Sequence, residues 1–321
     1  MIFSSIYSIK IRNEMDRSSY FIKDRAMFGS FPTQEAVNEL EKEGVRFFVN
    51  LTHDDEKKIE PYITRYTYIS FPIIDRHVPK DWSAYARFII RISDIIRNLS
   101  HGERVYLHCK GGHGRSGIVV ASILCYMFGT NPESALEHTT KSHSKRSVMR
   151  EKWRKLGSPQ TYYQKNFVYK FFEPLVFYRA YKSGPTAGFS NFTNHPVVIK
   201  GLGSFPTSEA AIQAYKNPTD KEYVEQQENA RTPIASKALG RKTELRKDWS
   251  QVCNKLMYTV VEAKFNQNKE LKENLIRTGL RPIVQHARGD YFWGDGGDGT
   301  GCNKLGKILT NLRESFYMED M

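Results

Sequence analysis

The residues best suited to chemistry lie in a short segment in the first half of the chain. It reads His108-Cys-Lys-Gly-Gly-His-Gly-Arg-Ser-Gly117, with Cys109 after one apolar run and Arg115 at the start of the next. Backbone N–H groups of a glycine-rich loop at a helix N-terminus can bind a tetrahedral oxyanion, and the guanidinium of Arg115 fits two of its oxygens. The same helix end favours the thiolate form of Cys109. The segment therefore predicts a nucleophilic thiolate beside a bound oxyanion.

This segment resembles the Cys-x5-Arg-Ser loop of cysteine-dependent protein tyrosine and dual-specificity phosphatases. The resemblance extends from about Phe28 to Phe172 and has the length of the short dual-specificity form. It implies that Cys109 forms a phosphocysteine, that Arg115 holds the equatorial phosphate oxygens and that Ser116 helps the thiolate to leave. It also implies that the loop contacts or supports the substrate through His108, Lys110, Gly111, Gly112, His113 and Gly114.

Such enzymes need a general acid for the leaving oxygen, which the family carries on a mobile loop about thirty residues upstream, often within Pro-x-x-Asp. The segment Phe71-Pro-Ile-Ile-Asp75 follows a strand-like run, so we expect Asp75 to be this acid. Asp81 is closer to Cys109 in spacing, but it directly precedes a helical pattern and is expected to cap that helix. Neither a metal nor a cofactor is expected, because Arg115 and the loop amides supply the charge.

The elements that must position these residues follow from apolar periodicity. Strand-like and helix-like segments alternate in the first half, at 36–44 (helix), 45–51 (strand), 66–71 (strand), 82–99 (helix) and 104–109 (strand). This alternation predicts an α/β domain with a mostly parallel sheet flanked by helices, whose ligands bind at the carboxyl ends of the strands. A turn-rich passage at 182–188 follows Pro174, which favours two domains with bounds 1–176 and 177–321.

The second half has longer helical patterns and few strands, which indicates an α+β, mainly helical domain. Its segments resemble, in order and spacing, the YbiA-like or NADAR domain of N-glycosidases. The landmarks that carry this resemblance include Phe189-Ser-Asn191, Pro206-Thr-Ser-Glu209, Lys237-Ala-Leu-Gly-Arg241, Asp248-Trp249 and Asp290-Tyr-Phe-Trp293. The resemblance implies cleavage of a ribose–nitrogen bond in a ribosylated base, or a site for an ADP-ribose-type ligand.

Cleavage of such a bond passes through an oxocarbenium-like state and needs carboxylates. Glu209 and Asp290 occupy family-matching positions, although an N-terminal cap or capping box is the alternative role for Glu209. The residues that the resemblance places around the ligand are Asn191, Lys237, Arg241, Trp249 and Trp293. Here the basic residues would hold a phosphate. The two tryptophans would stack on a flat base or, alternatively, pack in the core.

Composition limits the partners. The 321 residues include 48 Lys and Arg against 35 Asp and Glu, a net charge of +13, which favours anionic ligands. A basic cluster between Lys141 and Lys155 suits an acidic peptide, RNA or an inositide headgroup, and equally a solvated helix face. Four scattered cysteines favour a reducing, cytoplasmic location, and no apolar stretch is long enough to cross a bilayer.

The sequence therefore predicts a bifunctional hydrolase. The first domain would be a protein tyrosine or dual-specificity phosphatase acting on a phosphorylated protein or another phosphomonoester. The second would be an N-glycosidase that takes a nucleotide, a ribosylated base or an ADP-ribose ligand. Two alternatives remain open: a phosphatase of RNA 5′-phosphates, inositides or ADP-ribose phosphates, and a carboxy-terminal module that binds ADP-ribose without catalysis.

Overall fold

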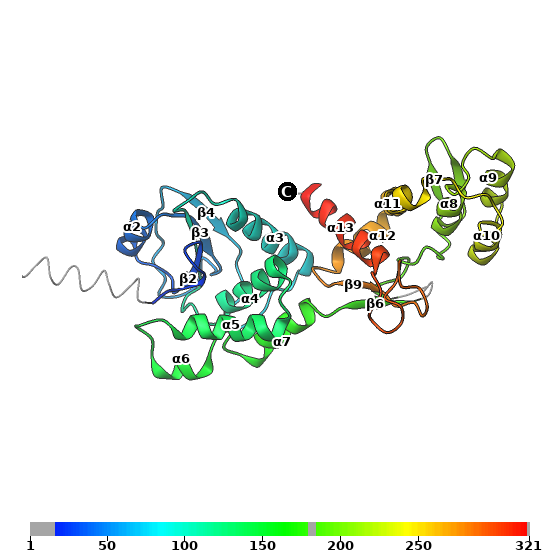
Figure 1. Cartoon of the computed structure of the whole chain (residues 1–321). Helices are drawn as coiled ribbons and strands as arrows, with labels where there is room; N and C mark the ends of the chain where they lie inside the picture. Colours follow the sequence, from blue (N-terminus) through cyan, green and yellow to red (C-terminus); the bar gives the residue numbers. More distant parts are fainter. Residues whose placement is uncertain (1–16, 179–183, 320–321) are drawn as a thin grey trace, which may run out of the picture. The chain divides into compact units, whose positions relative to one another are not determined.

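The computed structural model describes residues 17–178 and 184–319, in two compact units (Figure 1). The first unit ends at Phe172 and the second begins at Glu173. The elements of the first unit are β1 (Ser19–Ile22), β2 (Ala26–Gly29), α2 (Gln34–Lys42), β3 (Val45–Asn50), β4 (Thr67–Ser70), α3 (Trp82–Asn98), β5 (Arg104–His108), α4 (Arg115–Phe128), α5 (Pro132–Ser144), α6 (Glu151–Leu156) and α7 (Tyr162–Phe171).

One sheet organises the first unit, with strand order β1-β2-β5-β3-β4. Only β1 and β2 pair in antiparallel fashion; β2–β5, β5–β3 and β3–β4 are parallel. In the centre, Leu107 of β5 lies opposite Phe28 of β2 and Val49 of β3. This arrangement confirms the predicted mostly parallel sheet with flanking helices, and α3, α4 and α5 lie on the opposite side of it from α2 (Figure 1).

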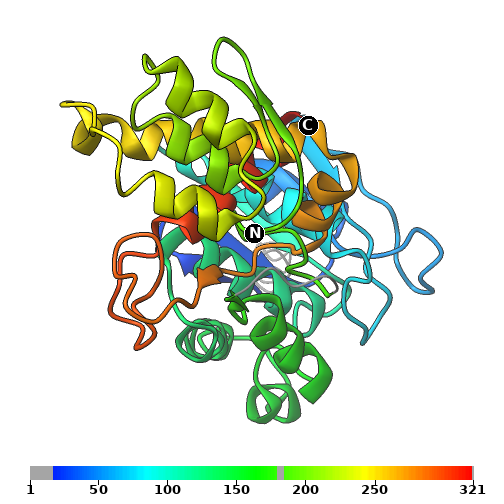
Figure 2. The ribbon, with the colours of Figure 1, turned by 90° about the vertical axis from the view of Figure 1, so that its right-hand side faces the viewer.

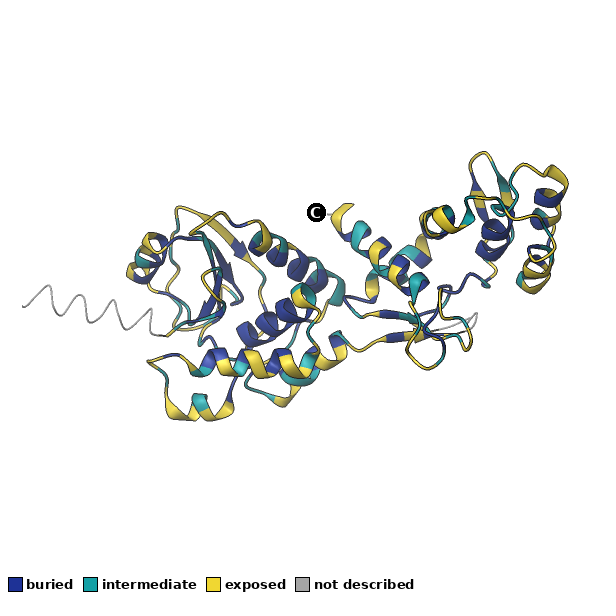
Figure 3. Ribbon diagram, in the orientation of Figure 1, coloured by how far each residue is buried: buried dark blue, intermediate teal, exposed yellow. Residues whose placement is uncertain are grey.

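Burial explains why these segments fold as they do. The strands β2 and β5 and nearly all of α4 are buried, as parallel sheets covered on both faces require (Figure 3). Helix α3 buries one apolar stripe, which includes Tyr85, Ile89 and Ile96. Strand β5 lies between two strands that are parallel to it, so its carboxyl end is in the middle of the row of strand ends where ligands bind in such folds. The residue at that end is Cys109.

The second unit is mainly helical. Its elements are β6 (Leu175–Phe177), β7 (Val197–Ile199), β8 (Gly203–Phe205), α8 (Ser208–Ala214), α9 (Lys221–Glu228), α10 (Pro233–Leu239), α11 (Trp249–Gln267), α12 (Lys269–Arg277), β9 (Ile283–Gln285) and α13 (Lys304–Glu319). Strands β6 and β9 form a parallel pair, and β7 and β8 an antiparallel pair. The yellow-green helices α8, α9 and α10 pack against one another (Figure 2). The predicted α+β, mainly helical class is confirmed.

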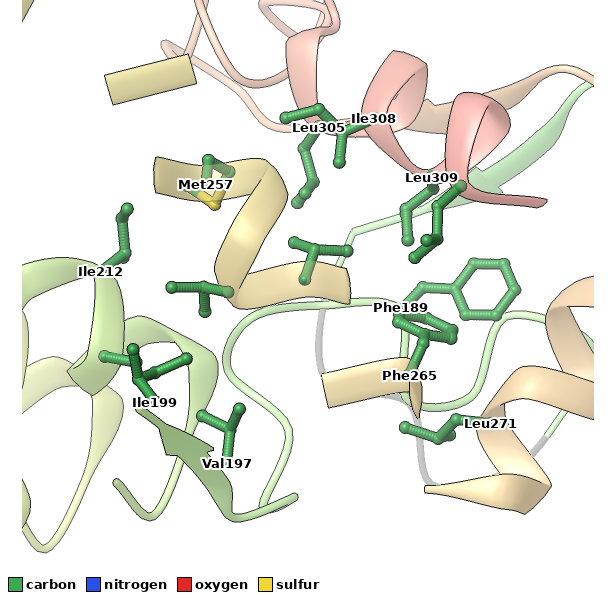
Figure 4. Close-up of a cluster of buried hydrophobic side chains, with 14 of the residues drawn as sticks. Phe189, Val197, Ile199, Ile212, Met257, Phe265, Leu271, Leu305, Ile308 and Leu309 are labelled. Carbon is green, nitrogen blue, oxygen red and sulfur yellow. The ribbon is translucent and has the colours of Figure 1, made fainter. Parts of the chain in front are cut away.

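One apolar cluster holds the second unit together. Side chains from α8, α11 and α13 meet in it, among them Ile212, Met257 and Leu309 (Figure 4). Phe189 and Phe265 also belong to the cluster, and their rings are in edge-to-face contact at 5.9 Å between centroids. Among the described helices of the whole chain, none combines the length and apolarity needed to cross a membrane.

Candidate active sites

The first candidate site lies at the junction of β5 and α4. Cys109 directly follows β5 and is buried, and its Sγ lies 3.4 Å from the Oγ of Ser116. Five loop residues later, Arg115 begins α4, whose N-cap Gly114 offers no side-chain hydrogen bond. The first backbone N–H groups of a helix have no partner within the helix. These groups and the helix dipole are therefore available to an anion at the loop.

Gly112 and Arg146 hold this loop in place. Gly112 has φ +71°, and a Cβ there would lie 2.3 Å from the carbonyl carbon of Gly29, so only glycine fits. Arg146 is buried and donates to the carbonyl oxygens of Gly112 at 2.9 Å and Phe28 at 3.0 Å. Burial lowers the pKa of Arg146 to about 10. This member of the predicted basic cluster is therefore not a solvated charge; it anchors the loop to β2.

Arg115 joins three segments of the first unit. Its guanidinium pairs with both carboxylate oxygens of Glu56, donates to the carbonyl of Ile73 at 3.0 Å, and lies 3.1 Å from Oδ1 of Asp75. Burial alone would raise the pKa of Glu56, but the hydrogen bonds and charge of Arg115 hold it below its usual value. The structure thus brings the predicted Asp75 to the loop. It also adds Glu56, to which the sequence analysis assigned no role.

The two aspartates that compete for the role of general acid differ in their surroundings. Asp81 caps α3 as predicted, since its Oδ1 accepts from the N–H groups of Ser83 at 2.9 Å and Ala84 at 3.0 Å. Asp75 does not cap a helix; its side chain is 60% exposed and, among the described residues, pairs with Arg115. Its carboxylate is therefore both next to the loop and open to solvent.

A second residue that the sequence analysis missed is Gln164, in the first turn of α7. It is buried, and a Cβ added to Gly114 would lie 2.7 Å from its Oε1. Gln164 also completes a capping box with Thr161. Its Oε1 and Nε2 therefore lie directly against the end of the loop between Cys109 and Arg115. The Thr-x-x-Gln spacing was a readable signal for the helix start, but not for contact with the loop.

Three histidines surround the loop, and their surroundings differ. His108 is fully buried and its Nε2 is 2.7 Å from the hydroxyl of Tyr62. It supports the strand end, and because solvent does not reach it, its predicted place among the substrate-binding residues gains no support. His113 Nδ1 lies 2.8 Å from Nε2 of the buried His143, and its ring stacks on Trp153.

These histidines predict acid sensitivity of the first unit. Burial lowers the pKa values of His108, His113 and His143 to about 3, 4 and 3. An exposed histidine has a pKa of about 6.5, so protons bind the unfolded chain more tightly. Stability is therefore lost as the pH falls below about 6.5, by about 1.4 kcal/mol per histidine per pH unit. Hydrogen exchange of the β5 amides between pH 7 and 5, corrected for intrinsic rates, measures this slope.

A matched pair of variants tests the assignment. His143→Gln removes one of the three groups and should flatten the slope, whereas His101→Gln, at an exposed position, should leave it unchanged. The carboxylates Glu41 and Glu56 have lowered pKa values, so their contribution to the stability of the fold is lost only below about pH 4.5, outside the pH range of this experiment. An unchanged slope in His143→Gln would refute the assignment.

The second candidate site is a cavity of about 240 Å³ in the second unit. Its lining includes six of the seven residues predicted for this half, namely Asn191, Glu209, Lys237, Trp249, Asp290 and Trp293. The seventh, Arg241, is exposed and does not line the cavity, so its predicted contact with a phosphate gains no support. Lys216 and Gln213, for which no site role was predicted, also line the cavity, as do the polar residues Ser190 and Gln285.

Glu209 does not have the capping role that was its alternative. The N-cap of α8 is Thr207, whose side chain accepts from the N–H of Ala210, while Glu209 turns into the cavity. Its Oε1 accepts from Nε2 of Gln213 at 2.7 Å. Burial raises the pKa of Glu209 above its usual value, against the opposing effects of Gln213 and nearby lysines. The cavity therefore holds a carboxyl group that keeps its proton to a higher pH than usual.

Asp290 also lines the cavity, together with Trp249 and Trp293. Its Oδ1 accepts from the backbone N–H of Trp293 at 2.9 Å and of Phe292 at 3.3 Å, which fixes its orientation. Trp249 and Trp293 line the cavity and also pack against the apolar cluster of the unit. For these two residues, the alternatives of ligand platform and core packing are therefore compatible.

A buried lysine shapes the loop that carries Asn191. Lys264 of α11 donates to the carbonyl of Ser190 and the hydroxyl of Thr193, both at 2.8 Å, and to the carbonyl of Gly188. Burial lowers the pKa of Lys264 to about 7. Beside this anchor, Oδ1 of Asn191 is buried without a hydrogen-bond partner among the described residues. It is an acceptor available to a ligand in the cavity.

Comparisons with known proteins agree with both halves. The family model of the Swiss Army Knife protein DSP-PTPase phosphatase domain matches residues 15–168, and that of the NADAR domain matches residues 176–317. The chain is 31% identical to the protein named as tyrosine phosphatase 197R of Invertebrate iridescent virus 6, over 91% of this chain and 89% of that protein.

The second half also matches single-domain proteins. It is 38% identical to the N-glycosidase YbiA of Shigella flexneri, over 41% of this chain and 82% of that protein. The NMR structure of YbiA from E. coli is similar with a TM-score of 0.42 at 36% identity, over 46% of this chain and 87% of that chain. Both predicted resemblances are confirmed, and the chain belongs to the family of proteins that join a DSP-PTPase phosphatase domain to a NADAR domain.

Proposed function

We propose that the first unit hydrolyses phosphomonoesters through a phosphocysteine on Cys109. The thiolate attacks phosphorus, an S–P bond forms as the ester O–P bond breaks, and Asp75 gives its proton to the leaving oxygen. Asp75 then takes a proton from water, which attacks phosphorus and breaks the S–P bond. Ser116, with Oγ 3.4 Å from Sγ, stabilises the departing thiolate.

The observation that carries this proposal is the position of Arg115. One guanidinium lies at the start of α4 and 3.1 Å from the Asp75 carboxylate, so it links the anion-binding loop to the proposed acid. Its Nε is buried and has no hydrogen-bond partner among the described residues. A planar guanidinium with an unused donor at a glycine-rich loop suits the equatorial oxygens of a phosphoryl group.

The role of Asp75 predicts a dependence on the leaving group. Asp75→Asn should lower kcat/KM for an alkyl phosphate such as phosphoserine by about 10²- to 10³-fold, because an alkoxide leaves poorly without a proton. Hydrolysis of p-nitrophenyl phosphate should fall less, because its leaving group is weakly basic. Steady-state kinetics with both substrates measure the difference.

The control is Asp81→Asn. Asparagine caps helices about as well as aspartate, so this variant should retain wild-type kinetics with both substrates. If Asp81→Asn produced the loss that depends on the leaving group and Asp75→Asn did not, the assignment of the acid would be reversed.

We infer further that the second unit hydrolyses an N-glycosidic bond in its cavity. Glu209, whose pKa is raised, would protonate the leaving nitrogen, and Asp290 would stabilise the oxocarbenium-like state and direct water to the sugar carbon. The C–N bond breaks as the C–O bond to water forms, and Asp290 takes up the water proton. The support is that both carboxyl groups and two indole rings line one cavity.

The ligands of both sites follow from these proposals. The phosphatase site would take a phosphorylated protein or another phosphomonoester, and the cavity a nucleotide, a ribosylated base or an ADP-ribose-type ligand. A thiolate nucleophile works only while reduced, so we also infer a reducing, cytoplasmic location. The described cysteines Cys109, Cys125, Cys253 and Cys302 are all free thiols, in agreement with such a location.

A further inference from the structure

A second cavity, of about 700 Å³, adjoins the phosphate loop. Its lining includes the loop residues Lys110, Gly111 and His113 and, from a later segment, Arg150 and Trp153. Neither Cys109 nor Arg115 lines it, so it is distinct from the place where a phosphoryl group would meet the thiolate. A cavity of this size accommodates a small ligand or a sizeable part of one.

The charge of this cavity is of one sign. Its lining includes four basic residues and no carboxylate. Arg146 uses its guanidinium to bind backbone carbonyls, and Lys110 donates to the carbonyl of Lys57 at 2.6 Å, which leaves two of its N–H groups. The guanidinium of Arg150 has no hydrogen bond or ion pair with any described residue. An anion in the cavity would therefore meet a cation that is not already neutralised.

His113 adds a neutral hydrogen-bond donor. The fully buried His143 has no partner for its Nδ1, so the tautomer that leaves no N–H unsatisfied places its proton on Nε2. That proton is donated to Nδ1 of His113, and the proton of His113 is then on its own Nε2. Stacking on Trp153, at 5.0 Å between ring centroids, fixes the ring. A Cβ on Gly111 would lie 3.4 Å from this Nε2, so the donor lies at the loop.

The loop connects the two places. Its backbone N–H groups serve a phosphoryl group on the thiolate side, while the side chains of positions 110 and 113 line the cavity. Gly111 lines the cavity and is two residues from Cys109, so the Cα atoms of these two residues lie at most about 7 Å apart. A phosphoryl group joined to the scissile one, directly or through a short ring, would therefore reach the cavity.

We propose that this cavity binds a second phosphoryl group of the substrate, held by Arg150, Lys110 and the Nε2–H of His113. The preferred substrates of the phosphatase site are then compounds with two phosphoryl groups close together, one cleaved at Cys109 and one retained in the cavity. The inference rests on the proposed phosphatase activity. Diphosphorylated 5′ ends of nucleotides and inositol bisphosphates share this chemistry.

The test compares the full-length wild type with Arg150→Ala. Substrates are p-nitrophenyl phosphate with one phosphoryl group, adenosine diphosphate and inositol 4,5-bisphosphate with two neighbouring ones, and a monophosphorylated acidic peptide. Arg150→Ala should lower the ratio of kcat/KM for a two-phosphoryl substrate to that for p-nitrophenyl phosphate by about tenfold or more, because it removes a charge-assisted contact. Whether the ratio falls for adenosine diphosphate or for the inositol bisphosphate shows whether the preferred substrate is a nucleotide or an inositide.

The matched control is Lys155→Ala, which removes one exposed positive charge from the same helix region outside the cavity and should leave the ratio unchanged. Calorimetry with the inactive variant Cys109→Ser adds a readout that needs no turnover. This variant should bind adenosine diphosphate more tightly than adenosine monophosphate, and the difference should disappear when Arg150→Ala is added. An unchanged ratio in an active enzyme overturns the inference, as does an equal loss in Lys155→Ala or a loss confined to the peptide. Absence of all hydrolysis by the wild type overturns the proposed phosphatase itself.

Discussion

Replacing Cys109 with serine should reduce phosphatase turnover by about 10⁴-fold or more, the scale seen when a catalytic nucleophile is removed. The serine hydroxyl is not ionised at neutral pH, and the adjacent His108 is buried and pairs with Tyr62, so it does not serve as a base for this hydroxyl. Arg115 and the loop are unchanged in the variant, so binding of inorganic phosphate should persist. Hydrolysis of p-nitrophenyl phosphate without added metal and phosphate titration measure the two properties.

The control for this experiment is Cys125→Ala on α4. Cys125 is buried and burial raises the pKa of its thiol to about 12, so it cannot supply a thiolate. The variant should therefore keep activity within about twofold of wild type. Equal activity of Cys109→Ser and wild type would exclude a phosphocysteine. A wild type that is folded, binds phosphate and hydrolyses nothing would make the first unit a binding module.

The centre of the phosphatase site could be predicted because it is local. Strand, cysteine, glycines, arginine and helix follow one another within a few residues, so spacing alone places Cys109 beside Arg115. The partners of that centre could not be predicted. Glu56 meets Arg115 across 59 positions of sequence, and Arg146 meets the Gly112 carbonyl across 34. Such pairs come together only when the sheet and its helices have folded.

In the second unit, too, contacts between segments far apart in sequence could not be predicted. Its strands span three residues each, too few for an alternating pattern to be visible, and they were not predicted. The β6 strand at Leu175–Phe177 pairs with β9 and lies in the unit that begins at Glu173, while the sequence boundary after residue 176 stays a prediction. The cavity residues come from segments far apart in sequence. Resemblance to a family selected them, where periodicity could not.

Changing Glu209 to glutamine should lower N-glycosidase turnover by about 10²- to 10⁴-fold, the usual contribution of a general acid. Glutamine keeps an oxygen that can accept the 2.7 Å hydrogen bond from Gln213, so the cavity wall is preserved while the transferable proton is lost. Release of ribose from a ribosylamino-pyrimidine measures turnover. Activity of the wild type should decline as the pH rises through the raised pKa of Glu209, because the acid must be protonated.

The pH profile separates a catalytic role from a structural one. In Glu209→Gln the residual activity should have lost this alkaline decline, whereas a variant that merely distorted the cavity would retain it at a lower rate. Glu225→Gln, on the exposed side of α9, makes the same chemical change outside the cavity and should match wild type. If Glu209→Gln kept full turnover while Asp290→Asn abolished it, Asp290 alone would carry the chemistry. If the wild type bound ligand without releasing sugar, the cavity would be a recognition site, and its two carboxyl groups would serve binding only.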